Sequence, residues 1–186
     1  MGTVTQVLNQ SSLSEALNDK RLQGILYQEL KVIAHGKIGQ QADKEINTTS
    51  LVHDAFIKIN KHEDKDIKWA SRKHFYATAA LAMKQILVDQ ARNKLAIKRG
   101  TEINQATFNE GQIKAEKYCH ELIALNDALF DLEKINKGLV ELVHLKYFVG
   151  LPVSEIAEIL QVSKKTVDRE WNKAKSLIKV MIEAKK

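Results

Sequence analysis

The chain has 186 residues, enough for one large or two small domains that each bury a modest hydrophobic core. Lysine and arginine number 29 against 23 for aspartate and glutamate, which leaves a formal net charge of +6. The single cysteine, Cys119, excludes an internal disulfide and the usual cysteine-based zinc site. Because no apolar run approaches ~18 residues and the N-terminus lacks the pattern of a secretion signal, we expect a cytoplasmic protein without a membrane segment.

The positive charge is concentrated in two segments of the chain. Between Lys68 and Arg99 there are eight cations and one anion, and from Leu151 to the C-terminus there are eight cations and five anions. Residues 40–67 and 121–150 are each slightly acidic. Contact with a polyanion at two separate places would account for this division, and two solvated helix faces would account for it as well.

Apolar residues recur at helical spacing in the first half of the chain, and strand-like alternation is absent throughout. We expect a helix from Ser12 or Ser14 to His35, a second over residues 51–59, a charged loop over residues 60–68 and a long helix over residues 72–99. The core-facing side chains expected on the long helix are Phe75, Ala79, Met83, Ile86 and Leu87. These helices predict an N-terminal domain over residues 1–100.

The helical periodicity lapses after Gly100, where threonine, asparagine, glutamine and glycine dominate. This change predicts a linker over residues 101–120, part of which could be helical, and a second domain over residues 121–186. The core positions expected on the first two helices of that domain are Leu122, Leu125, Leu129, Leu132, Leu139, Leu142, Val143 and Tyr147. The predicted fold class is all-α, with two small helical domains joined by the linker.

Residues 150–171 carry the most specific pattern in the chain. Pro152 can open a helix, and Ser163 can cap a following helix over residues 164–182. We expect a short turn between them with Val162 buried. The inner faces of the two helices would carry Ile156, Ala157, Leu160, Val167, Trp171, Ala174 and Ile178. This pattern predicts a helix-turn-helix with Trp171 in the core rather than stacked on a base.

The second helix of this motif has a basic outer face near its N-terminus. The outward positions are Lys164, Lys165, Thr166, Asp168 and Arg169. Such positions enter the major groove of DNA, where arginine and lysine read guanine edges or hold phosphates. The basic face of an ordinary helical hairpin is the alternative interpretation.

Several blocks of sequence, in a fixed order, point to one family. The first half contains Leu51-Val52-His53-Asp54-Ala55-Phe56, Trp69-x-x-Arg72-x-His74-Phe75-Tyr76-Ala77, Ile86-Leu87-Val88-Asp89-x-Ala91-Arg92 and Lys98-Arg99-Gly100. The second half contains Leu125-x-x-Ala128-Leu129-x-x-Leu132, Leu142-x-x-Leu145-x-Tyr147-Phe148-x-Gly150-Leu151 and the helix-turn-helix. Over nearly its whole length, the chain resembles an RNA polymerase sigma factor of the compact extracytoplasmic-function type.

The resemblance implies a promoter-specificity subunit that is not an enzyme. The helix over residues 51–59 would face the clamp helices of the largest subunit of core RNA polymerase. The charged loop, Trp69 and the basic helix after it would engage the melted minus-ten promoter element, and the C-terminal helix would read the minus-thirty-five element. A core position for Trp69, anchoring the start of the helix, is the alternative.

The residue roles follow from the same resemblance. The candidate DNA-binding residues are Lys68, Trp69, Arg72, Lys73, Lys84, Arg92, Lys98, Arg99, Lys164, Lys165, Thr166, Arg169 and Lys173. The candidate polymerase-binding residues are Thr48, Thr49, Ser50, Leu51, Asp54 and Ala55. The cations of the first half would track the DNA backbone as a basic groove.

One departure from the family pattern concerns the residues just before Leu51. Typical members carry a short acidic cluster there that faces the basic polymerase surface, whereas this chain has Asn47, Thr48, Thr49 and Ser50 and would belong to a subgroup lacking the cluster. These residues could simply cap the helix and leave the contact to Asp54, Asp43 and Glu45. The sharper hypothesis is a Ser/Thr protein kinase that restores the charge at Thr49, then Thr48, then Ser50, since a phosphothreonine carries about −1.5 to −2.

Two other functions remain open from the sequence alone. A stand-alone helix-turn-helix repressor would use its N-terminal domain to sense a ligand or to dimerise. A helical metal-dependent phosphohydrolase would use His53 and Asp54 as neighbouring ligands, but the rest of its ligand pattern is not evident. The chain has no phosphate-cradling glycine loop and no nucleophile elbow, and Cys119 is expected to be a spectator thiol, so no cofactor and no metal is expected.

Overall fold

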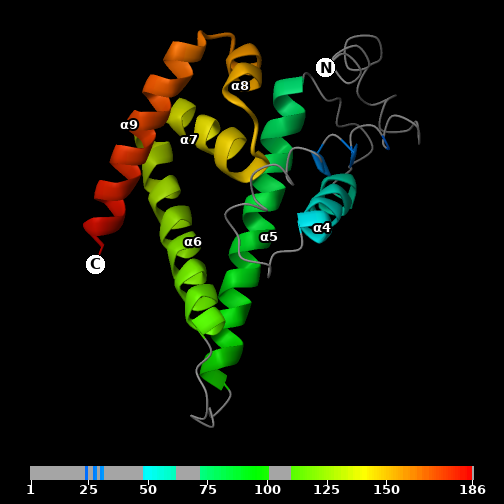
Figure 1. The fold of residues 1–186 in the computed structure, drawn as a ribbon, viewed down its shortest axis with the longest axis vertical. Coiled ribbons are helices and arrows are strands. Elements are labelled where there is room, and N and C mark those ends of the chain that lie inside the picture. Colours follow the sequence, from blue (N-terminus) through cyan, green and yellow to red (C-terminus); the bar gives the residue numbers. More distant parts are fainter. Residues whose placement is uncertain are drawn as a thin grey trace.

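The computed structural model describes residues 24, 27, 28, 30, 31, 48–61, 72–100 and 110–185, and the regular structure in these residues is helical (Figure 1). The elements are α4 (Thr48–Lys61), α5 (Arg72–Gly100), α6 (Glu110–Ile135), α7 (Lys137–Val143), the π-helical turn η1 (His144–Val149), α8 (Val153–Leu160) and α9 (Lys164–Glu183). The expected all-α class is confirmed for this part of the chain. Most of the first expected helix and of the charged loop lies outside the described residues.

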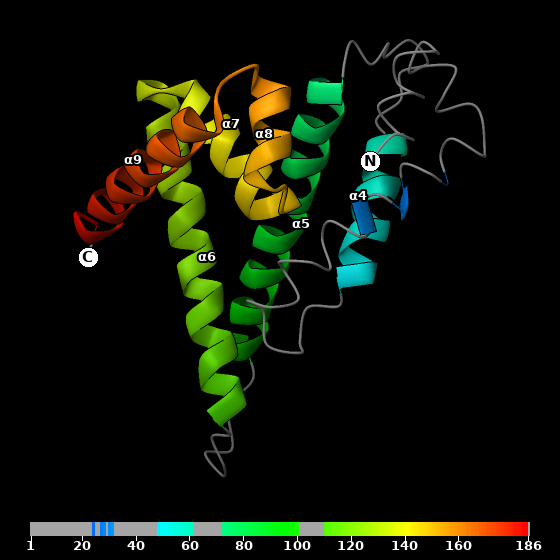
Figure 2. The same cartoon turned by 45° about the horizontal axis from the view of Figure 1, so that its top comes forward.

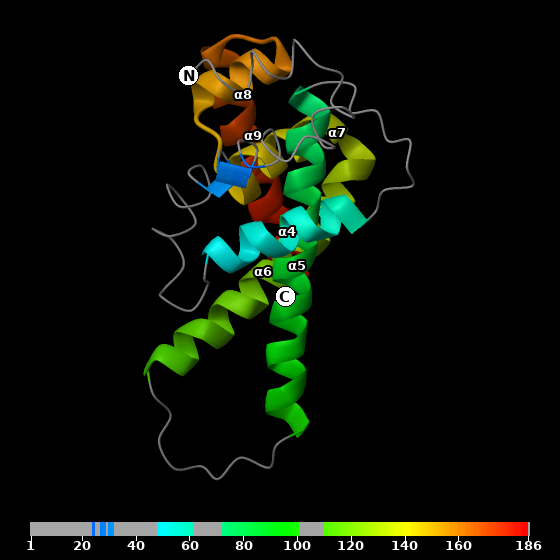
Figure 3. The same ribbon diagram turned by 90° about the vertical axis from the view of Figure 1, so that its right-hand side faces the viewer.

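Helix α5 is the centre of the described structure. It packs against α4 on one side and against η1 and α6 on the other, and Figure 3 shows α4 crossing it steeply. Four alanines are buried along it, namely Ala79, Ala80, Ala82 and Ala91. Small side chains let neighbouring helices approach closely, and the larger buried Phe75, Tyr76 and Met83 fill the space between them. The expected core stripe of this helix is confirmed, with Ile86 only partly buried.

The N-terminal and C-terminal helices share one hydrophobic core. Buried side chains of α4 and α5 are contiguous with those of α6, α7, η1, α8 and α9, and Figure 2 shows α5 lying alongside the C-terminal helices. Helix α6 begins at Glu110, so the second part of the expected linker is helical, and Cys119 within it is buried. The two expected domains are therefore in direct contact, and the division between them stays a prediction.

The turn η1 connects α7 to the helix-turn-helix. It buries Leu145 and Phe148 completely or nearly so and places them toward the shared core. Gly150 ends the turn with φ of 86°, a left-handed conformation that favours glycine, and its backbone N–H donates to the carbonyl of Leu145. The backbone N–H of Leu151 donates to the same carbonyl at 3.1 Å. This local geometry redirects the chain into α8.

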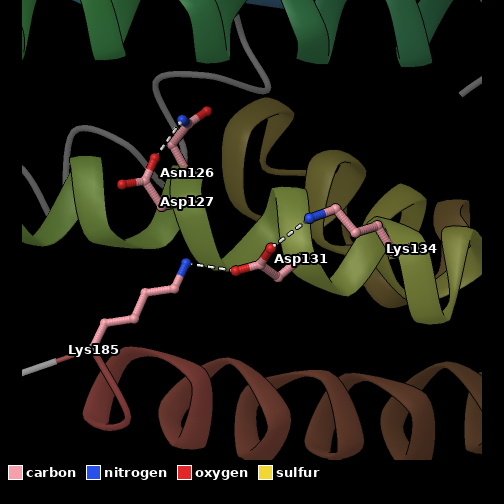
Figure 4. Close-up of polar contacts among 5 residues, drawn as sticks. All are labelled: Asn126, Asp127, Asp131, Lys134 and Lys185. Carbon is pink, nitrogen blue, oxygen red and sulfur yellow. Dashed lines mark hydrogen bonds and ion pairs between the residues drawn. The ribbon is translucent and has the colours of Figure 1, made fainter.

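The C-terminal end of the chain is tied to α6 by an ion cluster. The Asp131 carboxylate accepts hydrogen bonds from Lys185, just beyond α9, and from Lys134 at 2.9 Å (Figure 4). These two bonds lower the pKa of Asp131 to about 2. The side chains of this cluster are exposed, so its ion pairs position α9 against α6 but contribute little to the stability of the fold.

A histidine is buried in η1 without a hydrogen-bond partner for one of its nitrogens. His144 is 9% exposed, and its Nε2 has no partner among the described residues. Burial, and secondarily the charge of Lys84 on α5, lowers the pKa of His144 to about 4. The negative charge of Glu133 on α6 acts on the same lysine and opposes the lowering of its pKa by burial. The neutral imidazole is therefore the form that the folded protein keeps.

Acidification should destabilise the protein through His144. The folded state holds its pKa below the ordinary 6.5, so the unfolded chain takes up the proton first and stability falls as the pH drops from about 6.5 towards 4. We expect a loss of about 2 kcal/mol between pH 7 and pH 5 from this group, read from urea midpoints. His144→Gln should flatten this dependence of stability on pH. His120→Gln, which changes an exposed histidine on α6, should leave the dependence unchanged. An unchanged slope in His144→Gln would assign the acid sensitivity to other groups.

Candidate nucleic-acid interface

Helices α8 and α9 are joined by a short turn and pack against each other, which is the arrangement expected of a helix-turn-helix. Ile156 and Ala157 on α8 and Val167 and Ala174 on α9 are buried where the two helices pack. Pro152 is the N-cap of α8, one position earlier than an ordinary first helical proline. The small Ala157 side chain allows close packing of the second helix.

The turn between the two helices differs from its expected form at one residue. Gln161 ends α8 in the left-handed region with φ of 55°, and the next N–H donates to the carbonyl of Ala157 at 3.0 Å. The expectation that Val162 is buried is wrong, since it is 40% exposed. The left-handed backbone of Gln161 redirects the chain, so Val162 stays partly open to solvent. Its side chain lines a hollow with Leu139 and Leu160.

The N-terminus of α9 is capped as expected. The Oγ of Ser163 accepts a hydrogen bond from the backbone N–H of Thr166 at 3.0 Å, and the two hydroxyl oxygens are 2.8 Å apart. Such a cap satisfies one of the free N–H groups at a helix start and fixes where the helix begins. Thr166 is thereby half-buried and held by its neighbour, which leaves it less available to a base than the sequence suggests.

The predicted recognition cations lie on the outer face of α9. Lys164, Lys165, Arg169 and Lys173 are exposed, and Arg169 makes a side-chain contact with Glu170 at 3.2 Å. Trp171 packs partly buried against the core, with the ammonium groups of Lys146 and Lys175 at 5.4 and 5.8 Å from the centre of its ring. The core interpretation of this tryptophan is supported.

One further side chain shares this face and was not among the predicted residues. Asn172 is exposed one helical turn beyond Asp168 and next to Lys173. Its amide can donate to and accept from an adenine edge. The signal that finds it is the i, i+4 spacing from the first outward positions of the helix.

The predicted DNA-binding cations of α5 differ from one another in exposure and in contacts. The Nζ of Lys73 forms a salt bridge with Glu141 of α7 at 3.1 Å. Lys84 is half-buried beside α6, and this burial lowers its pKa against the opposing effect of Glu133. Arg92 is exposed. Lys68 and Trp69 lie outside the described residues, and the side chains of Arg72, Lys98 and Arg99 are not described although all three lie on α5.

The predicted polymerase-binding segment forms the start of α4. This helix begins at Thr48, so Thr48, Thr49 and Ser50 are its first turn, and the expectation that they precede the helix is wrong. No acidic residue stands in that turn. Leu51 and Ala55 are buried in the core, so in this arrangement neither offers a surface to a partner. Thr49 and Asp54 are half-buried and Ser50 is exposed.

The two neighbouring ligands of the phosphohydrolase alternative, His53 and Asp54, lie on α4. The described residues contain no group of three or more histidine, cysteine, aspartate or glutamate side chains placed to hold a metal ion. His53, a candidate ligand in the phosphohydrolase alternative, is exposed and meets the ring of Tyr27 edge-on at 6.3 Å. Among the helices that the structure describes, none has the length and hydropathy needed to cross a bilayer.

Comparison with known proteins places the chain in a family. A sequence model described as ECF sigma factor matches residues 1–183, which is nearly the whole chain. No curated protein and no solved structure matches it. The capped helix-turn-helix with its basic outer face agrees with this match. The chain belongs to the ECF sigma factor family, and as a sigma factor it directs RNA polymerase to promoters.

Proposed function

We propose that this sigma factor contacts a promoter at two places, with residues 121–186 on the minus-thirty-five element and residues 1–100 on the minus-ten element. Residues 101–120 would connect the two. The observation that carries the proposal is the capped start of α9, whose first turns expose Lys164, Lys165 and Arg169. A helix presented in this way fits the major groove, where these side chains reach bases and phosphates.

The N-terminal half has two roles in this proposal. Arg92 and the other cations of α5 track the DNA backbone, and the start of α4 with Asp54 meets the clamp helices of the largest polymerase subunit. The roles of Lys68 and Trp69 at the melted element rest on the family resemblance. The protein acts as a non-enzymatic subunit, in the cytoplasm, where polymerase and promoter DNA meet.

Transcription reconstituted in vitro tests the function. Purified protein should copurify in equal amount with core polymerase and should start transcripts at a limited set of sites on genomic DNA. Transcripts that depend on the added protein support the proposal. Binding to an operator without polymerase, or no polymerase association even after kinase treatment, would contradict it.

We also propose that phosphorylation of the first turn of α4 strengthens polymerase binding, with Thr49 as the preferred site. The first turn lacks a carboxylate, and the positive end of a helix stabilises a phosphate. A Ser/Thr protein kinase would thus supply the charge that typical family members carry in their sequence. Thr48 and Ser50 are the next candidates.

A charged residue at position 49 should mimic this modification. We expect Thr49→Glu to raise the affinity for core polymerase by about tenfold, a fraction of what a desolvated charge pair contributes at an interface. Thr49→Ala should leave the affinity of the unmodified protein for core polymerase unchanged and should abolish activation by a kinase. Affinity is measured without DNA, with Gln85→Glu on exposed α5 surface as the control for added charge. Tight binding by unmodified protein, unaffected by either Thr49 variant, would rule out the switch.

A further inference from the structure

We propose that Asp168 on α9 determines part of the promoter sequence that this protein accepts, by taking a hydrogen bond from the exocyclic amine of a cytosine and by repelling DNA that lacks this amine. The inference rests on the proposed contact of α9 with the major groove. Asp168 is not among the predicted DNA-binding residues, because phosphates repel a carboxylate. Its role is therefore to discriminate between sequences, and it does not add to affinity in general.

Asp168 lies on the face of α9 that the proposed contact presents to DNA. Lys165, Asp168 and Asn172 are exposed and follow one another at spacings of three and four positions, so they share one face of the helix. Val167 and Ala174 are buried on the inner face. Figure 1 shows α9 at the margin of the described helices, with its packing partners α6, α7 and α8 to one side of it. The face that carries Asp168 is open to a partner.

The two ordinary structural roles of an acid on a helix do not apply to Asp168. Lys164 and Lys165 stand four and three positions before it, at spacings where helical ion pairs form, but neither forms a salt bridge with it in the described part of the chain. The neighbouring Arg169 pairs with Glu170 instead, at 3.2 Å. Asp168 is the fifth residue of α9 and lies beyond the first turn, where the helix dipole stabilises an acid. Its carboxylate is thus free for an external donor.

A carboxylate inside the major groove needs a hydrogen-bond donor from a base. Phosphates of both strands repel it, and the loss of its water without a new hydrogen bond weakens binding. Guanine and thymine present acceptors in this groove, and adenine presents its amine beside the N7 acceptor. Cytosine presents the N4 amine without an acceptor, and it is the base from which aspartate accepts. Asp168 therefore selects cytosine.

The cations next to Asp168 make this selection effective. Lys165 and Arg169 are exposed on the same outer face and attract phosphates whatever the base sequence. Asp168 weakens binding to every sequence in which its carboxylate meets no amine. A site that combines attraction with such a repulsion discriminates by penalising the wrong partner. Removal of Asp168 should consequently improve binding to the wrong DNA, which is the opposite of the effect of removing a cation.

Binding to duplexes with single base changes tests the role of Asp168. The complex of the full-length protein with core polymerase first selects its preferred duplexes from a randomised library, and each base pair of the selected minus-thirty-five sequence is then changed singly. The wild-type complex should prefer cytosine at one position by about tenfold or more. In Asp168→Ala this preference should fall below about twofold, and the affinity for duplexes without the cytosine should rise. Fluorescence anisotropy at a fixed salt concentration measures both quantities.

Three further variants separate discrimination from charge. Glu183→Ala removes one negative charge from the last residue of the same helix and should leave the preference at every position unchanged. Lys164→Ala should weaken binding to all duplexes alike. Asp168→Asn should accept adenine as well as cytosine, because its amide both donates and accepts. Circular dichroism should show the same helix content in all variants, since the three side chains are exposed.

The outcomes distinguish this role from the promoter contact itself. If Asp168→Ala keeps the preference at every position, or weakens binding to all duplexes alike, Asp168 does not discriminate between bases and the proposal is wrong. The contact of α9 with promoter DNA would stand in both cases. If the wild-type complex selects no minus-thirty-five sequence, the proposed function of α9 fails, and the role of Asp168 fails with it.

Discussion

Replacing Lys165 and Arg169 by glutamate should lower the affinity of the polymerase complex for promoter DNA by at least 100-fold. Both side chains are exposed on the outer face of α9, within two turns of its capped start. Loss of one good contact to a base or phosphate costs about 1–3 kcal/mol, and an introduced carboxylate adds repulsion of the DNA backbone. Affinity is measured by fluorescence anisotropy at a fixed salt concentration, with circular dichroism to confirm that the helices remain folded.

The control for this prediction carries the same charge change away from the proposed groove. Lys137→Glu with Lys179→Glu alters two exposed lysines, one at the start of α7 and one in the last turns of α9. The affinity of this variant for promoter DNA should fall less than tenfold, because the substitutions remove only a long-range attraction that salt screens. The slope of affinity against salt should become shallower in the first variant by about two phosphate contacts. Equal losses in both variants would mean that net charge, and not the recognition helix, determines binding.

The helix-turn-helix could be predicted because its signals are local. Ser163 marks the start of α9, and the apolar spacing from Ile156 to Ala174 fixes which faces meet. The exposure of Val162 could not be predicted in the same way, because it depends on the left-handed backbone of Gln161, a residue that rarely signals this conformation. The family resemblance could name the DNA-binding surface, but not the geometry of each side chain within it.

The first turn of α4 and the contacts of the α5 lysines could not be predicted from sequence patterns. Thr48, Thr49 and Ser50 are polar and lack apolar spacing, so nothing in the sequence marks them as a first helical turn. The partner of Lys73 is Glu141, which lies far along the chain on another helix, and no local pattern connects the two. The sequence assigns Lys73 and Lys84 to a DNA-binding surface, whereas tertiary packing places both beside the C-terminal helices.

Truncation of Phe148 should test whether the two halves are stabilised together. Its side chain is 1% exposed and meets the rings of His144 and Tyr147 at 5.8 and 5.0 Å between centroids. Removing a buried phenylalanine ring costs about 3–5 kcal/mol, because apolar contact is lost and a cavity remains. Because η1 packs directly on α5, we expect Phe148→Ala to destabilise the described helices of both halves in one cooperative transition.

A second phenylalanine in the C-terminal half supplies the matched control. Phe130 on α6 is 63% exposed, with the ammonium of Lys134 4.3 Å from the centre of its ring, so Phe130→Ala should change stability by no more than about 0.5 kcal/mol. Urea unfolding of both variants is followed by circular dichroism and by hydrogen exchange of α5 amides. If Phe148→Ala weakens protection in α6–α9 but leaves α5 unchanged, the halves unfold independently. That result would mean that the contacts between η1 and α5 contribute nothing to the stability of α5.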